Sequence, residues 1–195
     1  MDERSDKLPR DMLDVGALAK QSWALFTSKP LEHIVASLIV IALGTVSLGV
    51  LIGPLCVGQI RMIDRQRQGD DIRIEHVFSG FDRFAPAFLT TLIMLVAVSI
   101  GLVLLVVPGV VLMVAWGFAL WFVALEGSSA LEALSASWAL LKQNTASVLL
   151  VILLSVVVNS LGSTILLGAI LTAPLSFIFT TLAFCQLREP APLVR

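Results

Sequence analysis

Three long stretches of this sequence carry no charged side chain, and they constrain the fold more than any other feature. Residues 33–60, 84–125 and 143–187 contain no Asp, Glu, Lys or Arg over 28, 42 and 45 residues. One helical crossing of a bilayer takes about 20 apolar residues. The second and third stretches are therefore each long enough for two crossings joined by a short turn.

The composition agrees with this interpretation. Apolar residues make up 57% of the chain, charged residues make up 14%, Tyr is absent, and the mean hydropathy is +0.96. A water-soluble domain of 195 residues cannot bury so much apolar surface. Backbone groups in lipid must be satisfied within their own segment, which favours helices. We therefore predict an all-α polytopic membrane protein.

The middle of the second stretch contains Pro108 and Gly109, and we expect them to form the turn of a helical hairpin. Proline suits the first turn of a new helix and disfavours helix in the residue before it. The alternative is one kinked helix, but 42 residues would make a helix of about 63 Å, twice the thickness of the hydrocarbon layer. In the third stretch, loop-forming residues predict a turn near 159–163.

The first stretch is ambiguous, because 28 residues are generous for one crossing and short for two. If it forms a hairpin, the chain makes six crossings and all 13 Lys and Arg residues lie on one side. A single crossing would separate the first five from the other eight. Cytoplasmic segments collect Lys and Arg, so we expect six transmembrane helices with both termini in the cytoplasm.

A partly polar stretch with an aromatic anchor precedes each charge-free stretch. The anchors are Trp23, Phe81 and Trp138, spaced 58 and 57 residues apart. This spacing predicts an internal threefold repeat of a unit with an interfacial helix and a two-pass hairpin. The alternatives are a site at the repeat interface and duplication without any site. The expected units are about 11–66, 72–126 and 128–188, within a single membrane domain 11–195 that follows a polar tail 1–10.

Two of the stretches that precede the hairpins have the pattern of amphipathic helices. In 14–29 and 128–144, apolar residues recur at helical spacing, and Ser128 or Ser129 with Glu132 forms the expected cap of the second. Such helices lie in the headgroup layer of a membrane. The alternative is that they are cytosolic ends of the spans, packed against one another.

The sequence offers no pattern typical of catalysis or cofactor binding. His33 and His76 lack a second ligand at metal spacing, and Cys56 and Cys185 fall in expected spans outside any C-x-x-C motif. Phosphate-binding and zinc-protease motifs are absent from the sequence. We therefore expect no catalytic residues, no metal and no cofactor, and we predict that the protein is not an enzyme.

Two groups of polar residues are candidate functional sites. The formal net charge of −1 gives no sign of a nucleic-acid partner. Amides within the spans are costly to leave unpaired and mark a candidate polar path. Arginines after the first hairpin are candidates for contacts with headgroups or a docking partner, although a solvated loop is the default interpretation of this segment. The amides are Asn159, Gln186 and Gln59, and the arginines are Arg61, Arg65, Arg67 and Arg73.

A family resemblance rests on four segments in order: "GPLCVGQIRMIDRQRQG", "FSGFDRFAPAF", "VVPGVVLMVAWGFALWFVALEG" and "ALSASWALLKQN". Over roughly residues 50–187, the sequence resembles uncharacterised bacterial inner-membrane proteins of the YciC type and the related membrane domains of some glycerophosphodiester phosphodiesterases. The resemblance implies six helices in a bacterial cytoplasmic membrane and no established activity. The first hairpin departs from this pattern in having almost no external loop. The soluble phosphodiesterase part is missing, so the hydrolytic activity is not carried over.

Two function classes follow from these observations. The first is a non-enzymatic scaffold or regulatory module that responds to the bilayer and contacts membrane lipids, another membrane protein or a second copy of itself. The second is a small channel or transporter with a polar path between the repeated hairpins. A lipid-modifying enzyme is a distant third, because the sequence shows neither a nucleophile with a base nor a metal cluster.

Overall fold

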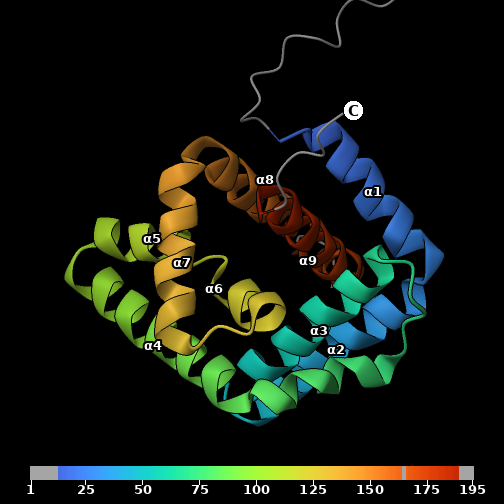
Figure 1. Cartoon of the computed structure of the whole chain (residues 1–195), viewed down its shortest axis with the longest axis horizontal. Coiled ribbons are helices and arrows are strands. Elements are labelled where there is room, and N and C mark those ends of the chain that lie inside the picture. The colour runs from blue at the N-terminus through green and yellow to red at the C-terminus, as the bar shows by residue number, and fades with distance from the viewer. Residues whose placement is uncertain (1–12, 164–165, 189–195) are drawn as a thin grey trace, which may run out of the picture.

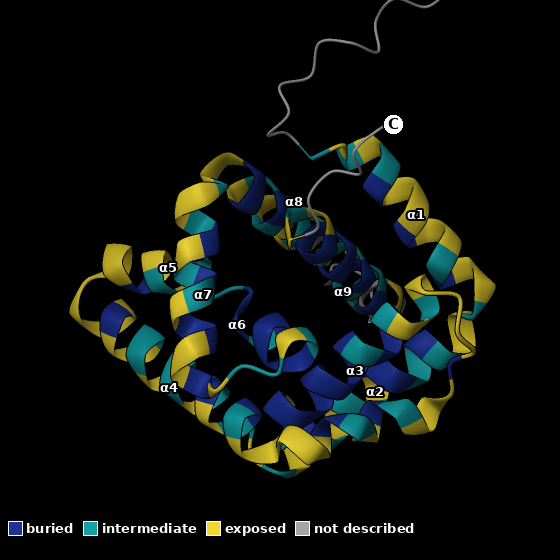
Figure 2. Cartoon of the chain, viewed as in Figure 1, coloured by how far each residue is buried: buried dark blue, intermediate teal, exposed yellow. Residues whose placement is uncertain are grey.

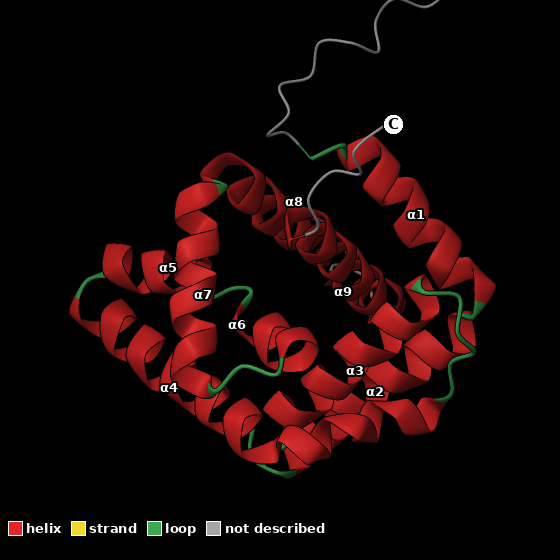
Figure 3. Cartoon of the chain, viewed as in Figure 1, coloured by secondary structure: helices red, strands yellow, loops and turns green. Residues whose placement is uncertain are grey.

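In the computed structural model, which describes residues 13–163 and 166–188, every regular element is a helix (Figures 1 and 3). This confirms the predicted all-α class, and the expected polar tail 1–10 lies outside the described residues. The elements in order are α1 (Val15–Ser28), α2 (Pro30–Val46), α3 (Ile52–Arg67), the 3-10 helix η1 (Ile74–Arg83), α4 (Phe84–Leu104), α5 (Val106–Ala115), α6 (Ala119–Trp121), the π-helical turn η2 (Phe122–Glu126), α7 (Ala130–Gln143), α8 (Thr145–Ser163) and α9 (Leu166–Arg188).

The second charge-free stretch forms a helical hairpin, as predicted. The chain reverses at Leu105, whose backbone is extended with φ −155° and ψ 125°. Pro108 and Gly109 lie in the first turn of α5, just after the reversal. The arms approach closely, because a Cβ atom on Gly101 would lie 2.8 Å from the Cα atom of Gly109. Two glycines therefore make the tight hairpin possible.

The first stretch is also a hairpin, because a turn over residues 47–51 separates α2 from α3. Leu48 and Gly49 in this turn have positive φ angles of 53° and 90°. Helix α3 is buried along residues 53–60, and Figure 2 shows this buried centre. A Cβ atom on Gly58 would lie 1.7 Å from the carbonyl oxygen of Val77 in η1. Helix α3 is thus the element against which α2, η1, α4 and α9 pack.

The chain bends sharply at two joints between consecutive helices, α1–α2 and α7–α8. Helices α1 and α2 meet at 93° around Lys29, and α7 meets α8 at 107° around Asn144. Pro30 is the first residue of α2, where its missing N–H group costs nothing. The capping box expected at the start of α7 is present, since Glu132 accepts hydrogen bonds from the backbone N–H and side-chain hydroxyl of Ser129.

Several helices are long and apolar enough to span a membrane. Among the described residues, the segments Ile74–Leu104, Val106–Glu126 and Leu171–Arg188 qualify by themselves, and up to five qualify if each bent pair is one span. Large apolar side chains lie exposed on α4 and α5, including Leu95, Val103 and Val107. Such a surface is typical of contact with lipid. Six crossings and a threefold repeat stay predictions.

Candidate functional site

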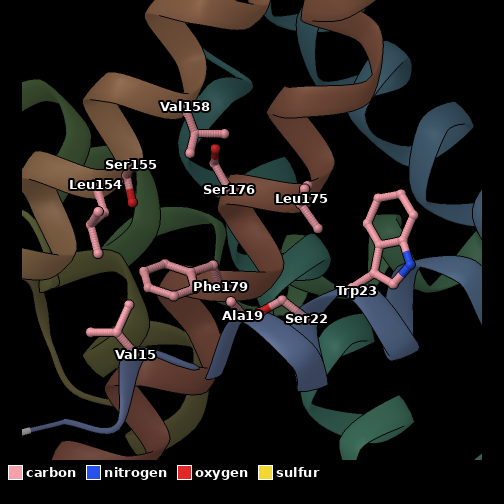
Figure 4. A pocket seen from close by; sticks show the side chains of 10 residues that line it. All are labelled: Val15, Ala19, Ser22, Trp23, Leu154, Ser155, Val158, Leu175, Ser176 and Phe179. Carbon is pink, nitrogen blue, oxygen red and sulfur yellow. The ribbon is translucent and has the colours of Figure 1, made fainter. Parts of the chain in front are cut away.

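A groove of about 320 Å³ lies between α1, α8 and α9, and we call it the α1–α8–α9 groove (Figure 4). This volume is at the lower end of the range for ligand pockets in proteins. The lining is almost entirely apolar. It consists of Val15, Ala19, Ser22 and Trp23 from α1, Leu154, Ser155 and Val158 from α8, and Leu175, Ser176 and Phe179 from α9.

Local sequence explains why α1 forms one wall of the groove. Leu18, Ser22 and Phe26 recur at four-residue spacing and are the buried residues of the helix. This stripe attaches α1 to the rest of the protein, and α1 contacts α9 more extensively than any other helix. Ala19 and Trp23 lie beside the stripe and are exposed. Helix α1 therefore packs against the protein through this stripe, and its neighbouring exposed face lines the groove.

The three serines in the groove differ in their hydrogen bonds. The Ser22 hydroxyl donates to the carbonyl oxygen of Leu18 at 2.8 Å, and Ser155 and Thr180 share a hydrogen bond of 3.2 Å. The Ser176 hydroxyl is buried and has no hydrogen-bond partner. Buried polar groups are nearly always hydrogen-bonded, so an orphaned one needs an explanation.

The groove adjoins an apolar outer surface. Leu153 and Val157, which neighbour the lining residues of α8 in sequence, are 60% and 44% exposed, and Leu171 of α9 is 48% exposed. Helix α9 includes a candidate span, and α8 belongs to a bent pair of helices that qualifies as one span by length and composition.

Hydrogen bonds from α3 hold the C-terminal end of α1. The Gln66 amide nitrogen donates to the carbonyl oxygen of Leu25 and to the hydroxyl of Ser28, both at 2.9 Å. Its amide oxygen lies 2.7 Å from His33 Nε2, and the imidazole of His33 stacks on Phe26 at 6.3 Å between ring centroids. Gln66 thereby fixes the bend between α1 and α2, and with it one wall of the groove.

The three amides of the predicted polar path lie in different surroundings. Gln59 is buried and donates to the Ser37 hydroxyl at 2.8 Å. Gln186 lines a separate cavity of about 460 Å³ with Gln21, Arg67 and Cys185, between α1, α3 and α9. Asn159 is exposed on α8, donates to the carbonyl oxygen of Ser155, and lines a third cavity. The cavities that hold Gln186 and Asn159 share no lining residue, and Gln59 lines neither of them.

Charged side chains at the ends of several helices are paired with one another. Arg61 donates to the carbonyl oxygens of Ala124 and Ser79 and pairs with Asp82, and Arg188 pairs with Glu126 at 2.7 Å. Further links are Lys29 with Asp71, Arg67 with Asp64 at 3.1 Å, and Arg83 with the carbonyl oxygen of Gly127 at 3.0 Å. These contacts gather the charged ends of α3, α9, η1 and η2.

The remaining candidate residues lie near these ends. Arg65 is exposed on α3, and Arg73 is the N-cap residue of η1. Among the aromatic anchors, Trp23 is 58% exposed and Phe81 is 38% exposed. Trp138 is half-buried, and the Lys142 ammonium lies 5.5 Å from its ring centroid. Exposed aromatic rings beside cationic groups are typical of a membrane interface.

The α1–α8–α9 groove was not predicted from the sequence. Ala19, Leu154, Leu175 and Phe179 look like ordinary apolar residues of helices, and nothing in their spacing marks them as lining residues. The groove depends on the distance that α1 keeps from α8 and α9, which is a tertiary property. Ser176 is one of ten hydroxyl-bearing residues in the third charge-free stretch, so the sequence did not distinguish it from the others.

The fold and the groove define the class: an all-helical protein with several helices that are long and apolar enough to span a membrane. A family model described as a domain of unknown function, DUF7847, matches residues 14–194, and the chain belongs to this family. No curated protein and no solved structure matches the chain.

Proposed function

We propose that this protein is a non-enzymatic integral membrane protein of the bacterial inner membrane that acts as a scaffold or regulatory module responding to the bilayer. The observation that supports this most is the pair of near-right-angle bends, 93° after α1 and 107° after α7. A helix in the plane of the membrane that leads into a crossing helix requires such an angle. Helices α1 and α7 are then the elements that contact the headgroup layer.

The paired helix ends support a six-crossing topology with both termini in the cytoplasm. Arg61 joins the end of α3 to η1 and η2, and Arg188 joins the end of α9 to η2. The bases of the three hairpins thus lie together, and each hairpin returns to the side from which it started. The positive-inside rule assigns that side to the cytoplasm, and the resemblance to YciC-type proteins favours a bacterial inner membrane.

The order of elements supports the threefold repeat. Helix α1 precedes the α2–α3 hairpin, η1 precedes the hairpin that begins with α4, and α7 precedes the α8–α9 hairpin. In this proposal the paired charged side chains hold the helices together. The main partners of the protein are membrane lipids. Exposed apolar faces such as that of α4 also fit another membrane protein or a second copy of the chain.

Cysteine accessibility tests the topology. In a background with Cys56 and Cys185 replaced by alanine, single cysteines at positions 48, 108 and 128 are labelled with a membrane-impermeant maleimide in intact cells and in inverted vesicles. Leu48 is exposed in the turn between α2 and α3, Pro108 is exposed in the first turn of α5 just after the reversal at Leu105, and Ser128 follows η2. We expect positions 48 and 108 to react from outside and position 128 from inside. The six-crossing topology requires positions 48 and 128 to react from opposite sides of the membrane. Labelling of both positions from the same side contradicts this topology.

Lipid quenching tests the interfacial position of α1. Variants that keep only Trp23 or only Trp121 are placed in vesicles whose phospholipids carry bromine near the headgroup end of one chain. We expect quenching of Trp23, which is 58% exposed, and little quenching of the control Trp121, which is 7% exposed. If an aqueous quencher reaches Trp23 while brominated lipid does not, α1 is a cytosolic helix and the proposal fails.

A small channel is the second candidate, and the cavity beside Asn159 favours it. This cavity of about 330 Å³ is lined by Asn159, Ser155, Ser160 and Thr180, among other residues. Flux of ions and small solutes through proteoliposomes tests it. Flux that is lost in Asn159→Leu but kept in Gln186→Leu, which alters a different cavity, would establish the channel. Absence of flux from correctly inserted protein excludes it.

A further inference from the structure

We propose that the outer face of η1 is a lipid-binding surface, and that Phe78, Phe81 and Phe84 insert into the hydrocarbon directly beneath the headgroups of the bilayer. The inference rests on the proposed membrane role and adds η1 to the elements, α1 and α7, that lie at the membrane interface. It also names the part of the lipid that η1 contacts, which is the acyl chains and not the charged headgroups.

Helix η1 has distinct faces because it is a 3-10 helix of ten residues, which is long for this type of helix. With three residues per turn, side chains at positions i and i+3 lie directly above one another. Val77 and Gly80 form one face, which is buried against α3. Phe78 and Phe81 form a second face, which is exposed, and Phe84 continues it as the first residue of α4. We call Phe78, Phe81 and Phe84 the phenylalanine row.

The phenylalanine row is continuous and exposed. Phe78, Phe81 and Phe84 are 45%, 38% and 36% exposed. Their rings stack in series at 6.2 Å between successive centroids, and Phe88 extends the series at 5.8 Å from Phe84. Single exposed apolar side chains are normal on a protein surface, but a contiguous apolar surface marks a site of interaction with an apolar partner.

Close packing on α3 fixes the direction in which the row points. A Cβ atom on Gly58 would lie 1.7 Å from the carbonyl oxygen of Val77, so the two backbones are already in contact. Arg61 of α3 also pairs with Asp82 of η1 at 2.7 Å. Helix η1 therefore cannot rotate to bury its phenyl rings against the protein, and the rings need a partner from outside.

The position of η1 in the chain favours lipid as this partner. The row leads directly into α4, and Ile74–Leu104 forms one candidate span. The 21 residues of α4 alone give a length of about 31 Å, which matches the thickness of the hydrocarbon layer. Exposed Leu89 and Leu92 continue the apolar surface along α4. Helix η1 then lies at the end of the span, where hydrocarbon meets headgroups.

The charges beside the row favour this boundary over a deeper position. Charged side chains are costly inside hydrocarbon, so a short helix that carries both charges and exposed phenyl rings lies where each can reach its own medium. Residues 73–83 contain two cations and two anions: Arg73, Glu75, Asp82 and Arg83. Because these charges cancel, we expect η1 to contact zwitterionic and anionic lipids equally.

The depth of spin labels tests the inference. In the background that lacks Cys56 and Cys185, the single substitutions Phe78→Cys, Phe81→Cys and Phe84→Cys are labelled in vesicles of phosphatidylethanolamine and phosphatidylglycerol. Collisions with oxygen, which concentrates in hydrocarbon, and with a water-soluble nickel chelate report the depth of each label. Exposed Leu95 of α4 and exposed Gln68 at the end of α3, replaced in the same way, are the references for hydrocarbon and water.

We expect all three labels on the row to collide mainly with oxygen, at depths between those of the two references, and the label at position 84 to lie deepest of the three. We expect the same depths in vesicles of phosphatidylcholine alone. The three positions are exposed to a similar degree, so the remaining two are informative if one variant does not fold.

A charge on the row tests the same inference without a label. Phe81→Glu places a carboxylate where we propose hydrocarbon, and the matched control Phe81→Leu removes the ring but stays apolar. In lipid nanodiscs we expect the midpoint of thermal unfolding to fall in Phe81→Glu relative to Phe81→Leu, because a carboxylate in hydrocarbon is costly. Equal midpoints in the two variants contradict the proposal.

Three results of the depth measurement overturn the inference. Labels at 78 and 81 that meet the nickel chelate as often as the label at 68 place the row in water. Labels that are shielded from both reagents place the row against protein, such as a second copy of the chain. A depth that is lost in phosphatidylcholine shows that charges and not phenyl rings hold η1 at the membrane. In each case a label at 95 that meets mainly oxygen leaves the proposed membrane function standing, whereas a label at 95 in water overturns that function as well.

Discussion

Arg61 Nη1 lies 2.7 Å from the Asp82 carboxylate, and this ion pair ties the C-terminal half of α3 to η1. The same guanidinium donates through Nε to the carbonyl oxygen of Ala124 and through Nη1 to that of Ser79. One side chain thus connects α3, η1 and η2. The sequence made Arg61 a candidate for contacts with headgroups or a docking partner; in the structure its side chain is 20% exposed and its guanidinium binds these three groups of the protein itself.

Replacing Arg61 by Gln should destabilise the fold, because two partly buried carbonyl oxygens and a carboxylate lose their donor. We expect a loss of about 1–3 kcal/mol and a lower midpoint of thermal unfolding in detergent. Arg65→Gln is the matched control, since Arg65 lies on the same helix with an exposed side chain. Equal midpoints for the two variants would show that the Arg61 contacts contribute nothing.

The close approach of α3 and η1 makes a second prediction. A Cβ atom on Gly58 would lie 1.7 Å from the carbonyl oxygen of Val77, and one on Gly80 would lie 2.0 Å from that of Pro54. Backbone atoms on both sides cannot move aside as a flexible side chain can. We expect Gly58→Ala to cost more than about 4 kcal/mol and to abolish recovery of folded protein in size-exclusion chromatography. Gly16→Ala, where the nearest atom is the Asp14 side chain at 3.3 Å, should be recovered normally.

The hairpins could be predicted from the sequence because the solvent imposes them. A charge inside lipid is expensive and a crossing has a fixed length, so the charge-free stretch 84–125 implied two helices and a turn. The reversal at Leu105 confirms this. The turn expected at 159–163 is wrong in its position, because α8 continues to Ser163. Asn159 is a helical residue whose amide donates to the preceding turn, which satisfies it without a loop.

Tertiary packing accounts for what the sequence did not predict. In α7, Leu131 and Leu134 belong to the same apolar pattern, yet Leu131 is 70% exposed and Leu134 is 5% exposed, while Ser137 is buried and donates to the carbonyl oxygen of Ala115. The apolar moment of a helix in lipid does not distinguish the face toward protein from the face toward hydrocarbon, because both are apolar. The groove could not be predicted for the same reason, because its lining residues are apolar like those that face hydrocarbon.

The ion pair between Lys29 and Asp71 makes stability depend on pH. The hydrogen bond and the charge of Lys29 lower the pKa of Asp71 below its ordinary value. A lowered pKa in the folded state means that the pair stabilises the fold above the pKa of Asp71 in the unfolded chain. This contribution is lost as the pH falls through the lower pKa of the folded state.

Asp71→Asn should therefore flatten the acid side of the pH profile of thermal unfolding. Because Asp71 is exposed, we expect a small change, visible as a difference between the profiles of wild type and variant below neutral pH. Asp70→Asn, which leaves the pair with Lys29 in place, serves as the control. Parallel profiles for wild type and Asp71→Asn would mean that the pair does not contribute.

Gln66 connects the stability of the bend to the groove, and its removal should loosen α1. Gln66→Leu removes the two hydrogen bonds that its amide nitrogen donates to Leu25 and Ser28, and the contact with His33. Without these hydrogen bonds, the C-terminal end of α1 is held to α3 less tightly by about 1–3 kcal/mol. Conformations in which α1 has moved away from α3 then become more populated. Spin labels at Lys20 and Arg65, both exposed, report the distance between α1 and α3. We expect a broader distance distribution in Gln66→Leu, whereas Gln68→Leu, which removes a hydrogen bond to Asp64 near the end of α3 itself, keeps the wild-type distribution. An unchanged distribution in Gln66→Leu would show that packing of Leu18 and Phe26 alone holds α1 in place.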